Sequence, residues 1–406
     1  MDADRNHRTR TLWLCGMLHG FTHVYPVALL PLYLQIQRDL NLARVEQATL
    51  LVTVMGLAIS LPSFPLGVLA DRFSRKMLLA AGLAVNGLGF VLLSWAPNYA
   101  AALAAVIIAG LGGSSYHPAA TALVSRLYPQ NKGRALGYLA IGASIGLFIG
   151  PAYTGWRAVG LGSWRMPVLE LGVLGILMAG IFAWFAEEKG GQAENAGVRR
   201  PKEVIFPTRA LWLFFLAICF AFGLRDFAGS GMRSLTSLFL QKAHGFDSKL
   251  TGLALSGLFL VSAISNPLFG GLSDRRGRIF WICFVLTTSA ILMCIFPRAS
   301  LCWMTPVLLM YGFLFVSSFP MVQAALMDSV PDAVRGRVFG LFITVGGLAG
   351  DVSHWVVGRW VERLGPSALS VQPYHWLFGW LSCLVFLSLL GVPCLHAIRK
   401  REHLEP

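Results

Sequence analysis

The chain has 406 residues, of which 56% are apolar and only 13% are charged, whereas soluble globular proteins carry about a quarter of charged residues. Its net charge of +14 would point to nucleic acid for a soluble protein, but the basic residues lie between long apolar runs, where they determine membrane topology. The composition therefore excludes a soluble nucleic-acid-binding protein and predicts a lipid bilayer as the surroundings of the chain.

The first apolar segment covers 11–35 and follows three arginines, Arg5, Arg8 and Arg10. The apolar region of a signal peptide spans only about 7–15 residues, whereas this run can cross a bilayer core of about 30 Å. We therefore predict a first transmembrane helix that is retained.

Eleven further segments of similar character follow along the chain. Backbone polar groups inside a bilayer must be satisfied within each segment, so these segments are predicted to be helices. The chain is expected to be an all-α polytopic membrane protein with twelve transmembrane helices; eleven would also fit the pattern, but twelve divides evenly. The segments are 11–35, 47–70, 77–95, 100–127, 135–157, 165–186, 210–241, 250–273, 279–296, 302–329, 338–361 and 374–394.

The distribution of Lys and Arg predicts the orientation of these helices. With the N-terminus in the cytoplasm, 22 of these residues fall on the cytoplasmic side and 9 on the opposite side. This ratio follows the positive-inside rule, so we expect both termini in the cytoplasm and the protein in a bacterial cytoplasmic (inner) membrane.

The seven cysteines lie in or beside apolar segments without metal-type spacing, so no metal and no cofactor are expected.

An internal repeat divides the chain into two similar halves. Similar decapeptides place Asp71 and Asp274 203 residues apart, and Pro118 and Pro320 repeat at 202. The polar, Gly-rich stretch between the halves resembles a linker. We predict two pseudo-symmetric six-helix bundles, 1–186 and 210–406, joined by a cytoplasmic linker at 187–209.

The segment from Gly67 to Lys76 resembles the G-x-L-x-D-R-x-G-R-[RK] signature of the major facilitator superfamily, between helices two and three. Ser74 replaces the usual second Gly, which the second copy keeps as Gly277. The resemblance implies that such residues latch the halves together on the cytoplasmic side; alternatively, the basic residues only set topology. The implied gating residues are Gly67, Asp71, Arg72, Arg75, Arg134, Asp274, Arg275, Arg278, Asp328 and Arg337.

The two copies of this signature differ in one respect. Asp328 follows helix ten, as in the superfamily, but the matching place in the first half holds Ser125 and Arg126. The first-half latch is therefore expected to be connected differently or to be weaker.

The fifth segment carries Gly142, Gly146 and Gly150 at intervals of four, followed by Pro151. Small residues on one helix face allow close packing. The stripe also partly resembles the G-x-x-x-G-P-x-x-G-G pattern of drug–proton antiporters, with Thr154 in place of a Gly. Helix packing explains it equally well.

The stretches His19-Gly-Phe-Thr-His23 and Gly110 to Pro118 resemble the fosmidomycin-resistance-type exporters, although His23 stands where an Asp is expected. This difference leaves the coupling chemistry and the substrate open. His19 and His23 are one helical turn apart and share a face, and with His117 they could form a cluster; each could instead merely bridge helices. The substrate-binding candidates are His19, His23, His117, Arg225, Arg233, Gln323 and His354.

Arg225 lies near the middle of the seventh segment. A permanently charged Arg at that depth needs an anion, either the substrate or a carboxylate on another helix such as Glu170 or Asp351. The adjacent Asp226 points about 100° away along the helix, so it needs a different partner unless one side chain bends back. Carboxylates in an apolar cavity can load protons, so the proton-coupling candidates are Glu170, Asp226 and Asp351.

No Walker-type phosphate-binding motif, catalytic nucleophile–base pair or soluble output domain is evident. We therefore predict a monomeric secondary active transporter, not an enzyme, in which two halves rock about a central site. The expected activity is proton-coupled export of a small amphiphilic or anionic compound. Proton-symport uptake of an organic anion is the alternative, and a transporter-derived sensor is a remote one.

Overall fold

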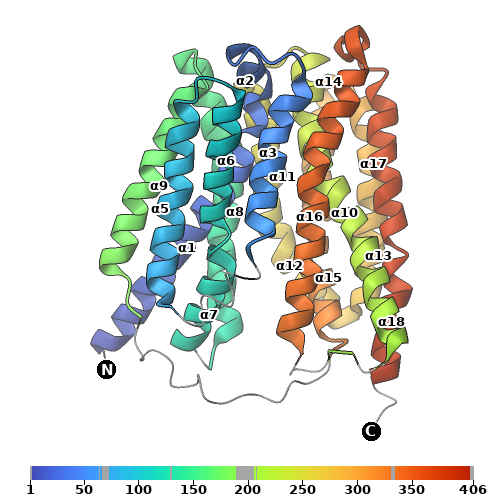
Figure 1. Ribbon diagram of the computed structural model, residues 1–406. Helices are drawn as coiled ribbons and strands as arrows, with labels where there is room; N and C mark the ends of the chain where they lie inside the picture. The colour runs from blue at the N-terminus through green and yellow to red at the C-terminus, as the bar shows by residue number, and fades with distance from the viewer. Residues whose placement is uncertain are drawn as a thin grey trace. The chain divides into compact units, whose positions relative to one another are not determined.

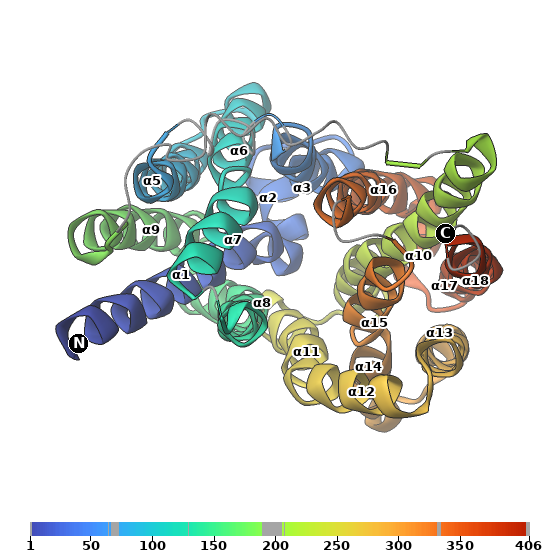
Figure 2. The same ribbon diagram turned by 90° about the horizontal axis from the view of Figure 1, so that it is seen from below.

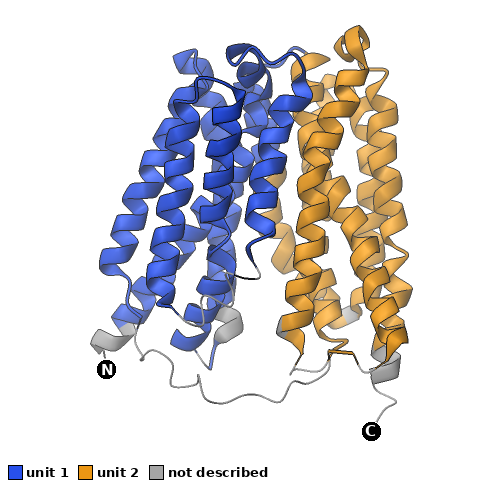
Figure 3. Ribbon diagram, viewed as in Figure 1, with its two compact units in different colours: residues 1–198, 245–256 blue, residues 199–244, 257–406 orange. Residues whose placement is uncertain are grey.

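The computed structural model describes residues 2–63, 65, 73–128, 130–188, 205–206, 208–330 and 334–402, with the backbone alone for 2–5, 132–134, 276, 336 and 399–402. These residues form helices and connecting turns and, within the described ranges, no strand. They divide into two compact units, residues 1–198 with 245–256 and residues 199–244 with 257–406 (Figure 3). The predicted linker at 187–209 lies largely outside the described residues, so the predicted domain boundaries stay a prediction.

Unit 1 is a bundle of α-helices with one 3₁₀ turn, η1, at Leu30–Leu32 (Figure 1). Its helices are α1 (Asp2–Ala28), α2 (Tyr33–Asp39), α3 (Val45–Ser60), α5 (Arg75–Ser94), α6 (Tyr99–Gly113), α7 (Tyr116–Leu127), α8 (Lys132–Leu161) and α9 (Arg165–Phe185). Residues 248–256 of α11 (Ser248–Leu260) also belong to this unit.

Unit 2 is a second helical bundle with 3₁₀ turns η2 (Phe296–Arg298) and η3 (Gly365–Leu369). Apart from the end of α11, it contains α10 (Arg209–Lys242), α12 (Ser262–Arg276), α13 (Arg278–Ile295), α14 (Leu301–Phe315), α15 (Ser318–Met327), α16 (Arg335–Arg363), α17 (Tyr374–Ser388) and α18 (Gly391–Glu402).

Ten spans in the described part of the chain are long and apolar enough to cross a membrane. They correspond to the third to twelfth predicted segments. For the second predicted segment the described helix, α3, is only 16 residues long, and much of the remainder lies outside the described residues. The first predicted segment is occupied by α1, η1 and α2.

The first predicted segment is not one continuous α-helix, which corrects the sequence-based expectation. The helix begins at Asp2, ends at Ala28 and is followed by a 3₁₀ turn before α2. Pro31 lies inside that turn. Because proline has no N–H and its ring crowds the preceding turn, it explains why α-helical hydrogen bonding is interrupted here.

The fourth and tenth predicted segments are each broken at a pair of serines. Ser114 and Ser115 separate α6 from α7, and their hydroxyls donate to carbonyl oxygens three residues earlier, at 2.6 and 3.0 Å. Ser317 and Ser318, 203 residues further on, make the same bonds at 2.6 Å between α14 and α15. Serine hydroxyls that bond back to the helix bend it. The same kind of serine-to-backbone hydrogen bond therefore interrupts corresponding helices of both units.

The glycine stripe of α8 packs against α1, as the sequence predicted for small residues on one face. A Cβ on Gly142 would lie 2.0 Å from the carbonyl oxygen of Gly16, and one on Gly146 would lie 2.1 Å from that of Gly20. Unit 2 repeats this arrangement: a Cβ on Gly346 of α16 would lie 2.1 Å from Oδ2 of Asp226 on α10. These close contacts fix the helix pairs that carry the ionisable residues of the transmembrane region.

Candidate functional site

Three histidines meet in unit 1, two from α1 and one from α7. Both helices lie beside α8 (Figure 2). One nitrogen from each imidazole of His19, His23 and His117 lies within 4.8 Å of the other two. The Nε2 atoms of His19 and His23 are 3.2 Å apart. His19 and His23 are half-buried, whereas His117 is exposed. The three side chains therefore lie close together, as predicted for a cluster, and their role in substrate binding stays a prediction.

Two neighbouring groups, the Leu139 carbonyl and the Tyr116 ring, hold the His19 imidazole in place. Its Nδ1 lies 2.7 Å from the carbonyl oxygen of Leu139 on α8, and a carbonyl can only accept, so Nδ1 carries the hydrogen. The ring of Tyr116 stacks on it with centroids 4.7 Å apart, and the Tyr116 hydroxyl donates to the carbonyl of Cys15 at 2.8 Å. These contacts fix both the orientation and the tautomer of the imidazole.

A second polar cluster in unit 1 joins α8 to α9. The Glu170 carboxylate accepts from the Tyr153 hydroxyl at 2.6 Å and from Nε of Arg157 at 3.1 Å, and it also pairs with Nη2 of Arg157. Glu170 is thus engaged with Arg157, which the sequence analysis did not consider as its partner. The ion pair stabilises the charged carboxylate.

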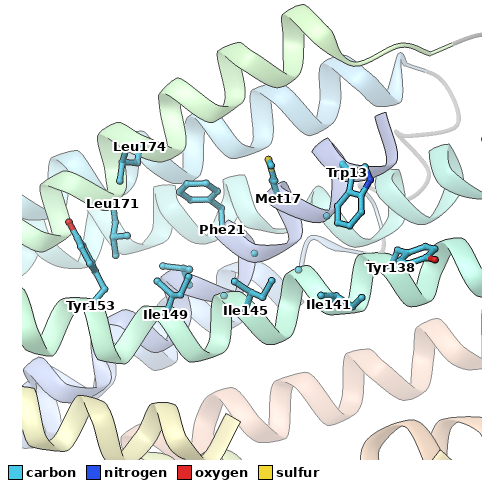
Figure 4. Close-up of a pocket in the computed structure, with 15 residues that line it drawn as sticks. Trp13, Met17, Phe21, Tyr138, Ile141, Ile145, Ile149, Tyr153, Leu171 and Leu174 are labelled. Atoms are coloured by element: carbon cyan, nitrogen blue, oxygen red, sulfur yellow. The ribbon is translucent and has the colours of Figure 1, made fainter. Parts of the chain in front are cut away.

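An apolar groove of about 430 Å³ is lined in part by Tyr153 of this cluster (Figure 4). It runs between α1, α8 and α9, and Tyr153 both lines the groove and donates to Glu170. Ligand pockets for small molecules have volumes of about 300–1,000 Å³ and are mostly apolar with a few polar groups. Its walls include Trp13, Met17, Phe21, Ile145, Ile149 and Leu171.

Arg225 in unit 2 is only 1% exposed and pairs with its neighbour Asp226. Nε and Nη2 of the guanidinium donate to Oδ1 of Asp226 at 2.9 and 2.7 Å, and the guanidinium carbon lies 4.2 Å from the Phe319 ring centroid. Among the described residues, the carboxylate that pairs with Arg225 is thus its own neighbour, and an ion pair with Glu170 or Asp351 on another helix stays a prediction. The long Arg225 side chain folds back along the helix, which brings the adjacent charges together.

The remaining predicted binding residues of unit 2 lie on α10, α15 and α16. Arg233 hydrogen-bonds to Ser230 and lies over the ring of Phe259, with its guanidinium carbon 5.8 Å from the centroid. His354 is buried and hydrogen-bonded through Nδ1 to Ser234 at 2.6 Å. Gln323 and Asp351 are half-buried. The substrate-binding and proton-coupling roles of these residues stay predictions.

The predicted gating residues of unit 2 form an ion-pair network. Arg278, at the start of α13, contacts Asp274 on α12 at 2.7 Å and Asp328 after α15 at 2.6 Å. Arg275 and Arg337 are exposed. One guanidinium thus ties together the ends of three helices within this unit.

The corresponding region of unit 1 is organised around Glu188, which the sequence analysis missed. Its carboxylate accepts from the Ser74 hydroxyl at 2.7 Å and from the backbone N–H groups of Arg75 and Lys76 at 3.2 and 3.1 Å. It therefore caps the N-terminus of α5, where a negative charge is favoured. Of the other predicted gating residues, Gly67, Asp71, Arg72 and the side chain of Arg134 lie outside the described residues.

Comparisons with known proteins agree over most of the chain. The family model of the Major Facilitator Superfamily matches residues 12–353. The fosmidomycin resistance protein of Escherichia coli K12 is 24% identical over 83% of this chain and 84% of its own length. The multi-drug resistance efflux pump PmrA of Streptococcus pneumoniae is 27% identical over 85% and 87%.

Solved structures show the same fold at low sequence identity. A bacterial homologue of the human lysosomal transporter Spinster, in an inward-facing and occupied conformation, matches with a TM-score of 0.77. It is 16% identical, and the match covers 97% of each chain. The nucleoside transporter NupG matches with a TM-score of 0.75 at 13% identity. Together with the helices described above, these matches confirm the predicted all-α, twelve-helix architecture.

Proposed function

Because this chain belongs to the Major Facilitator Superfamily and is an integral, multi-pass membrane transporter of small molecules, we propose that it is a proton-coupled exporter of a small amphiphilic or anionic compound. It works by alternating access, and its named relatives include a resistance protein and an efflux pump. The positive-inside distribution supports a bacterial inner membrane location with both termini in the cytoplasm. We further propose that it acts as a monomer.

The observation that carries the proposal is the groove of unit 1, which joins an apolar surface to a titratable ion pair. An amphiphile can lay its apolar part against Phe21, Ile145 and Leu171 while its polar head reaches Tyr153 and, beyond it, Glu170. Protonation of Glu170 ends its ion pair with Arg157 and removes an acceptor from the polar end of the groove. A proton and an amphiphile whose head group donates to this carboxylate exclude one another, which is the requirement for antiport.

Glu170→Gln in liposome-reconstituted protein tests this mechanism. We screen amphiphilic compounds and organic anions for flux driven by an imposed pH gradient. Glutamine keeps the hydrogen-bonding shape but cannot ionise, so gradient-driven accumulation of the cargo should be lost while downhill exchange persists. Persistence of full gradient-driven transport in Glu170→Gln would show that Glu170 does not couple protons.

The Arg225–Asp226 pair favours a second candidate, proton-symport uptake of an organic anion. Protonation of Asp226 would release the buried guanidinium of Arg225 to bind an anion. Proton and anion would then load together and move in the same direction. The two candidates differ in the sign of coupling: an inward proton gradient drives efflux in the first and accumulation in the second.

A further inference from the structure

The cluster of His19, His23 and His117 has the features of a metal site that the transport mechanism above does not use. Two of its members lie four residues apart on α1, so both imidazoles project from one helix face. The third comes from the first turn of α7. Each ring offers one nitrogen toward the same small volume.

The tautomer of His19 is suited to binding a cation. Its Nδ1–H donates to the Leu139 carbonyl, so in the neutral ring Nε2 carries a lone pair that points toward His23. Metal-binding histidines in proteins characteristically donate their other ring N–H to a backbone carbonyl or a carboxylate, which fixes the ring and makes the ligand nitrogen more basic. The stacked Tyr116 ring holds the same orientation.

The spacing of the nitrogens agrees with coordination geometry. For a tetrahedral Zn²⁺ with Zn–N bonds of about 2.0–2.1 Å, neighbouring nitrogens are about 3.3 Å apart. The Nε2 atoms of His19 and His23 are separated by 3.2 Å. The nitrogen of His117 lies within 4.8 Å of the other two, so its ring must come closer by a change of side-chain torsion for all three to bind one ion.

We propose that His19, His23 and His117 form a binding site for a divalent transition metal ion of the kind that prefers imidazole, such as Zn²⁺. Three protein nitrogens leave at least one coordination position for water or an oxygen atom of another ligand. Nitrogen ligands favour Cu²⁺, Zn²⁺ and Ni²⁺ over Mg²⁺ and Ca²⁺, which take oxygen ligands. The proposal goes beyond the transport function and does not depend on the identity of the cargo.

A simple hydrogen bond is the competing explanation for the short His19–His23 contact. Nε2 of His23 can donate its hydrogen to Nε2 of His19. For the metal to bind, the hydrogen of His23 must move to its Nδ1, so that both Nε2 atoms present lone pairs. A direct titration with metal distinguishes the two situations, since the hydrogen-bonded pair alone binds no ion.

The experiment uses the full-length protein purified in detergent through a tag that contains no histidine. Zn²⁺ is titrated against a chromophoric chelator, and Co²⁺ is added separately because its visible absorption reports ligand number and geometry. We expect one Zn²⁺ per chain, a Co²⁺ spectrum typical of four-coordination, and no competition by Mg²⁺.

Single variants then assign the ligands. His19→Ala, His23→Ala and His117→Ala should each weaken Zn²⁺ binding by more than the roughly 10–100-fold that loss of an outer-shell partner costs. His23→Asp, which restores a ligand oxygen, should recover part of the affinity. The matched control is His375→Ala, because His375 lies in unit 2, where its Nε2 hydrogen-bonds with the Pro297 carbonyl at 3.2 Å.

Two outcomes would overturn the proposal: no stoichiometric Zn²⁺ binding by the wild type, or equal affinity in the three variants and in the control. Size-exclusion profiles of all variants exclude unfolding as the cause of lost binding. Because the titration does not involve transport, failure here leaves the proposed export activity intact, and failure of the liposome assay leaves the metal site intact.

Discussion

Arg225 shows how a buried charge in a transmembrane helix is made tolerable. Its guanidinium is 1% exposed, bonds twice to Asp226 and lies against the Phe319 ring. Removing one partner of a buried ion pair costs about 3–5 kcal/mol, because the other charge is left uncompensated, whereas replacing both can be neutral. We therefore expect Arg225→Ala to abolish transport and also to destabilise the protein in detergent.

The double variant Arg225→Leu with Asp226→Asn separates these two effects. It removes both charges, so thermal stability should return close to the wild-type value while transport stays lost. Arg225→Lys should restore transport poorly, since an ammonium group cannot make the forked contact or stack on Phe319 in the same way. Normal flux in the double variant would show that the pair has only a structural role.

Sequence reasoning identified the charged residues of the bundle but not all of their partners. Helix geometry places Asp226 about 100° from Arg225 and leaves open whether one side chain bends back, and the pairing of the two shows that one does. Arg157 stands at the end of the fifth predicted segment and was not considered as a partner of Glu170, with which it pairs. Contacts between helices depend on packing, which one sequence does not reveal, whereas the spacing of His19 and His23 lies within a single helix and could be predicted.

At the scale of helices, the glycines of α8 and α16 determine how closely the helix pairs approach. Gly346 of α16 faces Asp226, and an added Cβ would lie 2.1 Å from Oδ2 of that carboxylate. Gly346→Ala should force Asp226 to move and disturb its pairing with Arg225. Overpacking typically costs about 1–3 kcal/mol, so we expect lower thermal stability and a marked loss of flux.

The matched control is Gly340→Ala, six residues earlier on the same helix, where nothing lies within 4 Å of an added Cβ. Alanine there should be neutral or stabilise by up to about 1 kcal/mol, because glycine is the weaker helix former. Melting temperature and transport are measured for both variants. Similar behaviour of the two would contradict a role for close packing at Asp226.

The positions of the helices were predictable from apolar segments, but the breaks inside them were not. Ser114 and Ser317 interrupt helices through hydrogen bonds to carbonyl oxygens three residues earlier. The mean hydropathy of a segment does not reveal such bonds. The glycine contacts of α8 were predictable because a four-residue period is visible in one sequence. Glu188 was not found because it lies just after α9, in a polar stretch that had been assigned to the linker.

At the scale of the whole molecule, the two units differ in how their helix ends are tied together. In unit 2 the guanidinium of Arg278 joins Asp274 and Asp328, whereas in unit 1 the carboxylate of Glu188 caps α5. The sequence predicts that the first-half latch is connected differently or is weaker, since Ser125 stands where the second half has Asp328. This stays a prediction, because Asp71 and Arg72 lie outside the described residues.

Asp328→Asn tests whether the unit 2 network controls gating. Asp328 and Arg278 are 49% and 26% exposed, and ion pairs of this kind contribute only about 0–1 kcal/mol to stability. Unfolding should therefore be almost unaffected. The same 1 kcal/mol, applied to an equilibrium between inward-open and outward-open states, changes their ratio about fivefold. We expect turnover to change by up to about that factor while the Kd of the cargo stays the same.

The control for this prediction is Asp39→Asn, which breaks an ion pair with Arg165 of comparable exposure, 42% and 28%, outside the predicted gate. Cargo binding to detergent-purified protein and flux in liposomes are measured separately for both variants. A change of turnover in Asp328→Asn alone supports gating, because a cargo that binds both states equally well keeps its Kd when the ratio of the states shifts. Equal loss of binding and flux in Asp328→Asn would place Asp328 in the binding site. If Asp39→Asn slowed turnover as much as Asp328→Asn, the effect of Asp328→Asn would be only a general response to the loss of a surface charge.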